Sequence, residues 1–231
     1  LNYTNKTERP SYTKEGLLAM CTKENADADK QNMIAVLNNW KKNQEEEKPL
    51  LIIMNTSGGG SRSATFTMNI LQHLDSVTGG TIMKKVFLIS GASGGMLGAA
   101  YFRELVLQKQ NGKNIDPRDK KYVADISGDL LNPLFSSFVA RDLISPAQKF
   151  AVGRYTYLKD RAYAFENKLN ENTRGLLNKQ LKDYKEDESK ANIPLLVFGS
   201  VVTRDGRKML ISTQPVRFMM QPIHDSAYLP A

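Results

Sequence analysis

The stretch Lys85–Gly95 reads KVFLISGASGG, and it decides the fold. Val86–Ile89 is a run of four apolar residues, which is typical of a strand buried inside a parallel sheet. Gly91–Gly95 follows at once and matches the pattern G-x-S-x-G, in which a serine lies on a sharp turn between a strand and a helix. Small residues two positions before and after Ser93 keep this turn free of steric clashes. We expect a helix from Met96 to about Gln108.

A second glycine-rich turn precedes this one. Leu50–Met54 is a short apolar run after Pro49, and it predicts another strand buried in a parallel sheet. Ser57–Ser63 reads SGGGSRS and predicts a tight loop, and helical periodicity continues from Ala64 to about Val77. Both turns therefore follow strands and precede helices. This order places them at the carboxyl ends of strands, where open α/β sheets hold their sites.

The other segments complete an α/β order. They are a helical segment over 11–47, a mostly helical stretch over 119–183 that ends in a long polar helix from Arg161 to Asp183, a strand over Pro194–Val202, a hairpin turn at Asp205-Gly206 and a return strand over Lys208–Ser212. This order predicts a three-layer α/β fold with a mainly parallel central sheet flanked by helices. We expect residues 1–48 to form an N-terminal helical segment and residues 49–231 to form the main domain.

The two turns carry the residues needed for attack on a carbonyl group. A serine on such an elbow presents its hydroxyl group as a nucleophile, and the helix that follows points its positive end at the site. Bare N–H groups of a glycine loop can stabilise the oxyanion that forms, and Arg62 can hold a phosphate or brace the loop. The loop fits a dinucleotide fingerprint poorly, because Ser63 replaces the last glycine of G-x-G-x-x-G. It also lacks the Gly-Lys-Ser/Thr of a P-loop.

At these two motifs the sequence resembles the patatin-like phospholipases and the related catalytic domain of cytosolic phospholipase A2. Patatins carry Asp-Gly-Gly-Gly-x-Arg-Gly and then Gly-x-Ser-x-Gly. Here Ser57 replaces the leading aspartate and Ser63 replaces the trailing glycine, which is closer to the cytosolic phospholipase A2 form. The resemblance covers roughly Leu50 to Ser212, and its distinct motifs end at Gly95.

The resemblance implies a patatin-like fold and a serine carboxylic-ester hydrolase that acts on phospholipids or other acyl-ester lipids. It implies no cofactor and no metal. The site residues that it implies are Ser93 as the nucleophile, Gly58, Gly59 and Gly60 as oxyanion donors, Arg62 as the arginine of the loop motif, and Gly91 and Gly95 as the small residues of the elbow.

The resemblance also implies a Ser–Asp dyad without histidine, whose aspartate lies in an Asp-Gly-Gly or Asp-Gly-Ala loop well after the nucleophile. Asp205-Gly206 is the only Asp-Gly pair after Ser93, and we interpret it as an exposed hairpin turn. We therefore expect the catalytic aspartate beyond Ala231, so that the main domain continues past this sequence.

Two alternatives stay open. A triad-type α/β-hydrolase needs a histidine after the acid, and His224 is the only histidine after Ser93. His73 lies about three helical turns from the glycine loop and is expected to point away from the site. The second alternative is a non-catalytic lipid-binding protein that keeps both loops without the dyad. The apolar stretch Leu130–Val139 is interpreted either as the lining of an acyl cleft or as core.

The net charge, the cysteine count and the length of the apolar runs limit the kinds of partner and environment that we expect. The net charge of +8 fits either a lysine-rich surface or peripheral contact with an anionic membrane, and no nucleic-acid-binding signature is present. Cys21 is the only cysteine, which excludes an intrachain disulfide, and a structural zinc site is not expected. Apolar runs are too short to span a bilayer, so we expect a soluble or peripheral protein. A signal or anchor can precede Leu1, and the Lys- and Asn-rich composition suggests a bacterial source.

Overall fold

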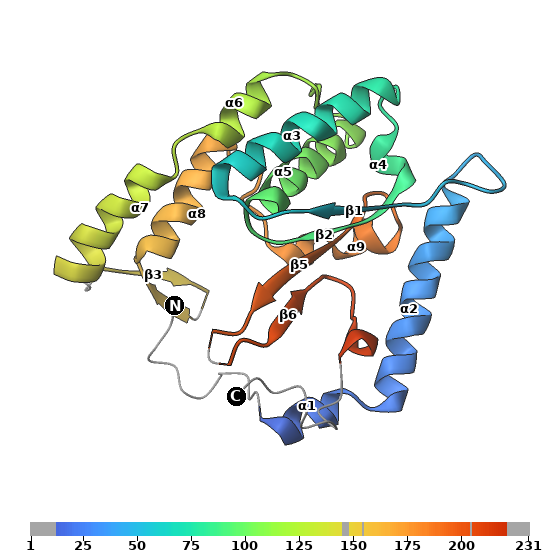
Figure 1. Ribbon diagram of the computed structural model, residues 1–231, viewed down its shortest axis with the longest axis horizontal. Coiled ribbons are helices and arrows are strands. Elements are labelled where there is room, and N and C mark those ends of the chain that lie inside the picture. Colours follow the sequence, from blue (N-terminus) through green and yellow to red (C-terminus); the bar gives the residue numbers. More distant parts are fainter. Residues whose placement is uncertain (1–12, 145–147, 154, 204, 221–231) are drawn as a thin grey trace.

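The computed structural model describes residues 13–144, 148–153, 155–203 and 205–220. At its centre is a four-stranded sheet with the order β1-β2-β5-β6 (Figure 1). The strands are β1 (Ile52–Thr56), β2 (Val86–Gly91), β5 (Leu195–Val201) and β6 (Lys208–Ile211). β1, β2 and β5 run parallel, and β6 pairs antiparallel with β5. The sheet is therefore mainly parallel, as the order of the predicted elements indicated.

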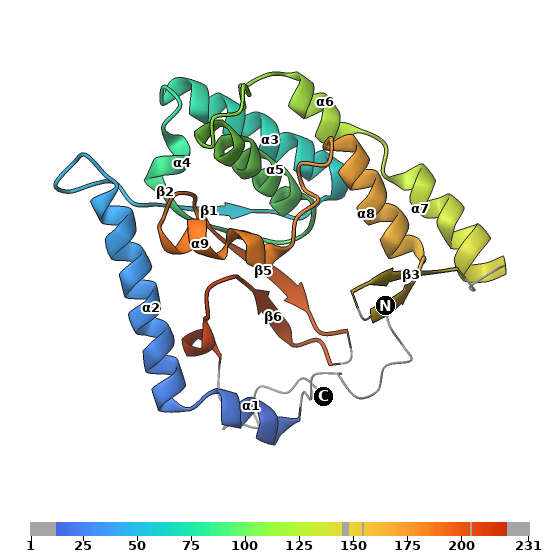
Figure 2. The same cartoon turned by 180° about the vertical axis from the view of Figure 1, so that it is seen from behind.

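Two long helices build the main core with this sheet. α3 (Gly60–Val77) follows β1, α5 (Ser93–Gln110) follows β2, and the two helices lie against each other (Figures 1 and 2). Their apolar sides and one face of the sheet share a single buried cluster, which includes Met68, Leu71, Ile89, Met96, Phe102 and Leu196. The expected α/β class, with helices flanking a mainly parallel sheet, is confirmed.

The remaining elements surround this core. They are α1 (Lys14–Met20), α2 (Lys23–Lys42), α4 (Ile82–Lys85), α6 (Lys121–Ser127), α7 (Leu131–Ser137), the π-helix η1 (Phe138–Ile144), the hairpin of β3 (Lys149–Val152) and β4 (Tyr155–Leu158), α8 (Arg161–Asn172), the 3₁₀ turn η2 (Leu181–Tyr184), α9 (Lys185–Ser189) and the 3₁₀ turn η3 (Arg217–Met219). α2 and α7 lie at opposite ends of the molecule (Figures 1 and 2). Within the described ranges, no helix is long and apolar enough to cross a membrane.

The N-terminal helices are attached to the main part by buried contacts. The Trp40 ring of α2 packs edge-on against Phe87, and its indole N–H donates a hydrogen bond to the Lys84 carbonyl group at 3.1 Å. Asp29, which is buried, accepts hydrogen bonds from the backbone N–H and the guanidinium group of Arg217. These bonds hold the pKa of the Asp29 carboxyl group below its ordinary value. The domain boundary near residue 48 stays a prediction.

The prediction for the first strand was wrong in its range and its environment. Leu50 and Leu51 precede β1 and are exposed, and the strand continues to Thr56. Ile53 is 54% exposed and alternates with partly buried neighbours. The reason is that β1 stands at the edge of the four-stranded sheet, and only its Ile52 and Met54 side chains reach the core cluster.

The helix predicted over 11–47 is interrupted and ends early. Thr22 separates α1 from α2 and caps α2, because its hydroxyl group accepts a hydrogen bond from the Asn25 backbone N–H at 3.2 Å. α2 then ends at Lys42, before the acidic run that follows. Thr22 has the extended backbone of an N-cap residue (φ −71°, ψ 157°), so a helix cannot continue through it from α1.

The stretch over 119–183 contains a hairpin and a shorter helix than predicted. Strands β3 and β4 pair antiparallel around Gly153, and the Phe150 ring packs on Tyr163 of α8 with 4.5 Å between ring centroids. α8 ends at Asn172 rather than near Asp183. Arg174 (φ 56°) and Gly175 (φ 74°) take left-handed conformations there, which end an α-helix.

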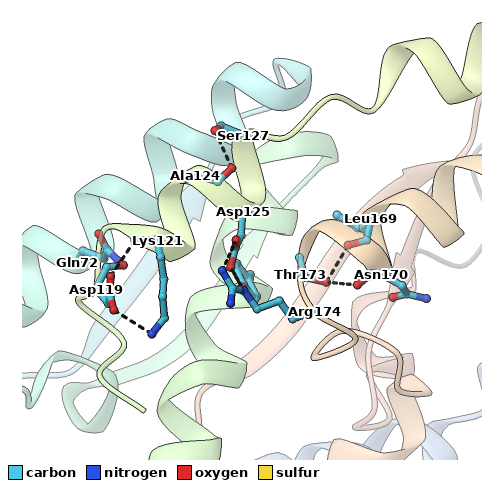
Figure 3. Close-up of polar contacts among 11 residues, drawn as sticks. Gln72, Asp119, Lys121, Ala124, Asp125, Ser127, Leu169, Asn170, Thr173 and Arg174 are labelled. Atoms are coloured by element: carbon cyan, nitrogen blue, oxygen red, sulfur yellow. Dashed lines mark hydrogen bonds and ion pairs between the residues drawn. The ribbon is translucent and has the colours of Figure 1, made fainter.

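Polar contacts fix α6 to its neighbours on both sides (Figure 3). The Gln72 amide of α3 donates to the carbonyl groups of Pro117 and Asp119 just before α6, each at 2.9 Å. Asp125 of α6 accepts two hydrogen bonds from the Arg174 guanidinium group, at 2.8 and 3.1 Å, just beyond α8. These contacts anchor α6, and with it the chain that enters α7.

Candidate active site

The elbow at Ser93 has the geometry of a strained strand-to-helix turn. β2 ends at Gly91, Ala92 is extended (φ −142°, ψ 158°), and α5 begins at Ser93. Ser93 has a φ of 57°, a value shared among the described non-glycine residues only by Arg174 and Ala191. Such a conformation costs free energy in an L-residue and is typical of functional sites. Ser93 is exposed, so its hydroxyl group is accessible from solvent.

Glycines at the Ser93 elbow allow its backbone to lie directly against the backbone of the glycine loop. A Cβ atom added at Gly91, Gly94 or Gly95 would fall far inside van der Waals contact with backbone atoms of the first motif. The opposing atoms are the carbonyl oxygens of Thr56, Gly60 and Ser57, respectively. Gly98, one turn further along α5, meets the Ala64 carbonyl group of α3 in the same way. Glycine is therefore required at four positions of G-x-S-G-G-x-x-G by packing as well as by the turn.

The glycine loop reaches the serine itself. A Cβ atom placed on Gly58 would stand 4.0 Å from Ser93 Oγ and 3.4 Å from Ser93 Cβ. Gly59 (φ 147°) and Gly60 (φ 60°) then turn the chain directly into α3. The amino ends of two 18-residue helices, α3 and α5, thus converge at Ser93. Free N–H groups and helix dipoles at this point favour negative charge.

Both helices begin earlier than the sequence analysis predicted. α3 was expected from Ala64 and starts at Gly60, and α5 was expected from Met96 and starts at Ser93. Apolar periodicity marks only the part of a helix that faces the core, so the glycine-rich first turns carried no signal. Gly60 and Ser93 are therefore the first residues of α3 and α5, and Gly59 is the N-cap of α3.

Ser63 fastens the glycine loop to the first turn of α3. Its hydroxyl group donates a hydrogen bond to the Ser57 carbonyl group at 2.6 Å, and its backbone N–H bonds to the Gly59 carbonyl group at 3.4 Å. From the sequence, Ser63 was interpreted only as a replaced glycine. The bond spans six residues, which is longer than the local side-chain-to-backbone patterns of serine, so no local signal predicts it.

Arg62 lies exposed in the first turn of α3, on the same loop. One register position before the strands end, Ser90 of β2 donates a hydrogen bond to the Asn55 side chain of β1 at 2.5 Å. This pair was not predicted from the sequence. It adds a polar side-chain contact beside the two turns, between the strands that carry them.

The described residues place no base against Ser93. Asp205 is exposed at the hairpin between β5 and β6, and its carboxylate accepts hydrogen bonds from the Arg207 guanidinium group, at 2.9 Å from Nε. His73 is exposed on α3, and His224 lies outside the described residues, as does any residue after Ala231. No described carboxylate or imidazole group is hydrogen-bonded to Ser93. The described part of the chain also holds no cluster of three potential metal ligands.

The apolar stretch Leu130–Val139 was interpreted from the sequence either as the lining of an acyl cleft or as core, and its residues differ in burial. Leu130 is buried at the edge of the core, whereas Leu131, Phe135 and Val139 are exposed. The segment is therefore neither wholly core nor shown to line a cleft.

Comparisons with known proteins add little to this geometry. No family model matches the chain, and no curated protein sequence matches it. A solved structure that is similar to it is human GIVD cytosolic phospholipase A2 in complex with methyl gamma-linolenyl fluorophosphonate, with a TM-score of 0.43 and 14% sequence identity. The match covers 89% of this chain and 28% of that chain, so this chain spans less than a third of that protein. Similarity at this level carries no argument about function, which rests on the site alone.

Proposed function

We propose that this chain carries the nucleophile and the oxyanion-binding loop of a lipid acyl hydrolase, a serine carboxylic-ester hydrolase of the phospholipase A or lysophospholipase type. One observation carries the proposal. An exposed serine in a strained backbone conformation starts a helix, and the glycine loop of a second helix lies against it, so that a Cβ atom added at Gly58 would stand 4.0 Å from the serine Oγ atom. The motifs that meet there are those in which the sequence resembles the patatin-like phospholipases, and this resemblance supports a lipid substrate.

The proposed reaction begins with attack of Ser93 Oγ on the carbonyl carbon of the ester. The carbonyl oxygen becomes negatively charged, and the N–H groups of the glycine loop and of Gly94 donate hydrogen bonds to it. Collapse of this intermediate breaks the ester C–O bond and releases the alcohol, which takes up the proton that Ser93 has given to the base. Water then hydrolyses the acyl–serine bond and restores Ser93.

The base of this proposal is an aspartate beyond Ala231. Asp205 is a poor candidate, because its carboxylate is bound by Arg207 in the hairpin that carries both residues. We expect Asp205→Asn to keep the rate of ester hydrolysis within about twofold of wild type. A loss comparable to that of a Ser93 variant would assign the base to Asp205 instead.

The test of the proposed function is hydrolysis by the full-length protein of a water-soluble ester, p-nitrophenyl butyrate, and of a lysophospholipid. Ser93→Ala is expected to reduce both rates to the uncatalysed background, because no other group supplies the attacking oxygen. Ser76→Ala, which removes another exposed serine hydroxyl from the far end of α3, is the matched control and should leave both rates unchanged. Hydrolysis that survives Ser93→Ala would contradict the proposal.

A further inference from the structure

A hydrogen bond between two side chains joins β1 and β2 just before the two turns of the candidate site. Ser90 Oγ donates to Asn55 Oδ1 at 2.5 Å, and the two residues stand opposite each other in the strand register. Only one register pair, Thr56 with Gly91, follows them before the turns begin. Within the described ranges, neither side chain makes another hydrogen bond. We name Asn55 and Ser90 the strand-end pair.

The strand-end pair is equally far along the chain from the two residues that meet at the site. Gly58 follows Asn55 by three residues, and Ser93 follows Ser90 by three residues. A Cβ atom added at Gly58 would stand 3.4 Å from Ser93 Cβ, so the two turns are already in close contact. Because β1 and β2 are parallel and paired up to these turns, a shift of one strand end against the other moves Gly58 relative to Ser93.

The position of β1 in the sheet makes this contact important for the placement of the glycine loop. β1 stands at the sheet edge and pairs, within the described part of the chain, with β2 alone. Met54 and Ile89 belong to the core cluster that the sheet shares with α3 and α5 (Figures 1 and 2). Side chains alternate along a strand, so the strand-end pair lies on the opposite face of the sheet. Gly94 of α5 packs against the glycine loop from the helix side, and the strand-end pair ties the two strands together from the other side.

The residue types at these positions are explained by the hydrogen bond and not by strand formation. Asparagine is depleted in strands, where β-branched and aromatic residues are favoured. β1 carries an apolar residue even where the side chain is exposed, as at Ile53, and changes to asparagine only at its next exposed position. Asn55 therefore contributes neither to the core nor to strand propensity, and its described role is to accept the hydrogen bond from Ser90.

We propose that Asn55 and Ser90 are positioning residues, whose hydrogen bond sets the place of the glycine loop relative to Ser93. This inference rests on the proposed function. Oxyanion donors act within about 2.7–3.1 Å of the oxygen that becomes charged, and a displacement of about 1 Å in such a site can lower a rate about 10²-fold. The pair acts through the two turns and not by contact with the substrate, so its loss lowers kcat and leaves KM unchanged.

The test is hydrolysis of p-nitrophenyl butyrate by the full-length protein, with kcat and KM measured separately. We expect Asn55→Ala and Ser90→Ala each to lower kcat about ten- to a hundredfold with KM unchanged. Because both substitutions remove the same hydrogen bond, the double variant should lose no more than either single variant. Ser90→Thr keeps the hydroxyl group and should recover most of the kcat that Ser90→Ala loses.

Asn32→Ala is the matched control for Asn55→Ala. It removes the hydrogen bond from Asn32 Nδ2 to Gln214 Oε1, 3.1 Å long, which joins α2 to the segment after β6. This variant should keep the wild-type kcat, whatever its effect on the midpoint of urea unfolding. Urea unfolding of all variants thus separates a loss of stability from a loss of site geometry.

Four results would overturn the inference: wild-type kcat in both single variants, additive losses in the double variant, an equal loss in Asn32→Ala, or no recovery in Ser90→Thr. Asn55 is exposed, so Asn55→Ala still tests the bond if Ser90→Ala does not fold. An active wild type whose variants keep the wild-type kcat refutes the positioning role alone. A folded wild type that hydrolyses neither p-nitrophenyl butyrate nor a lysophospholipid refutes the proposed function, and this inference with it.

Discussion

The two halves of α5 are built on opposite principles. At its amino end, Ser93, Gly94, Gly95 and Gly98 make room by having no side chain or a small one, and backbone meets backbone across to α3. In its second half, Arg103, Glu104 and Gln108 are large, polar and buried, and they interact with charged or polar partners. The amino end of α5 thus depends on glycines that allow close backbone contact, whereas its second half depends on buried charged side chains that have partners.

The scaffold half ties α5 to the second half of the chain. Glu188 of α9 accepts hydrogen bonds from Arg103, from Thr213 and from the backbone N–H of Leu196 on β5. Glu104 accepts them from Lys179 at 2.6 Å and from the Tyr184 hydroxyl group at 2.8 Å, and burial raises the pKa of Tyr184 above its ordinary range. Substitutions in the two halves should therefore have different effects. A larger side chain at the amino end should impair the site, and removal of a charged partner in the second half should destabilise the fold.

The largest effect is expected at the buried ion pair. Glu188→Ala leaves the Arg103 guanidinium group buried without its counter-charge, which should lower the free energy of unfolding by about 3–5 kcal/mol. Glu186→Ala on the same helix removes an exposed partner of Lys190 and should change it by less than about 0.5 kcal/mol. Urea unfolding followed by circular dichroism measures both. Equal losses would show that the network is not what holds α5 to α9.

A methyl group in the site half should affect rate more than folding. Gly94→Ala forces a Cβ atom into the Gly60 carbonyl group, so the glycine loop must move from Ser93. Loss of oxyanion donors lowers kcat by about 10²–10³, and overpacking costs about 1–3 kcal/mol of stability. Ester hydrolysis and urea unfolding are measured side by side.

The control for this variant is Gly128→Ala. The three atoms nearest to its added Cβ atom all belong to the Asn172 side-chain amide, the closest 2.7 Å away, and this side chain can shift where backbone cannot. Gly128→Ala should keep the wild-type rate of ester hydrolysis, whatever its effect on the free energy of unfolding. A Gly94→Ala enzyme with wild-type kcat would remove the glycine loop from the reaction.

A smaller effect is expected from the bond that fastens the glycine loop. Ser63→Ala removes the hydrogen bond to the Ser57 carbonyl group, and a bond of this kind contributes about 0.5–1.5 kcal/mol. We expect kcat for ester hydrolysis to fall about two- to tenfold with KM unchanged, because the loop is positioned less well. Thr65→Ala deletes a similar hydroxyl-to-carbonyl bond, two residues further along α3, and should leave kcat unaltered. A change in KM alone would assign Ser63 a binding role instead.

The smallest effect is expected at the Asp29–Arg217 ion pair, which lies outside both halves of α5. Hydrogen bonds from Arg217 lower the pKa of Asp29 in the folded state, so the folded state binds fewer protons than the unfolded state near that pKa. The stabilisation is complete above the unfolded pKa of about 3.9 and is lost as the pH falls through the folded pKa. Asp29→Asn should therefore be less stable than wild type at neutral pH, and the difference should shrink as the pH falls from about 3.9 through the lower folded pKa. Parallel stability curves across that range would contradict this linkage.

The sequence predicted the parts of the fold that follow from local pattern. Four strands and both strand–loop–helix turns were found because apolar runs and glycine motifs are read from neighbouring residues. The β3–β4 hairpin was missed, although Phe150, Tyr155 and Tyr157 around Gly153 carry a strand-and-turn signal. Thr22 was likewise a readable helix-capping residue.

Other features depend on contacts between distant segments. Arg103, Glu104 and Glu188 have the appearance of solvent-facing residues in a sequence, and only the fold brings their partners together. The approach of Gly58 to Ser93 follows from the pairing of β1 with β2, which no local pattern fixes. No described carboxylate or imidazole group is hydrogen-bonded to Ser93, so its base and the roles of the site residues stay predictions.

The most direct test of the central claim is covalent labelling of the full-length protein with a fluorophosphonate probe, followed by peptide mass spectrometry. The account predicts a single labelled residue, Ser93, and predicts that both Ser93→Ala and Gly94→Ala suppress labelling, since the probe needs the nucleophile and an open oxyanion site. Labelling of a different residue, or no labelling of a folded protein, would contradict it.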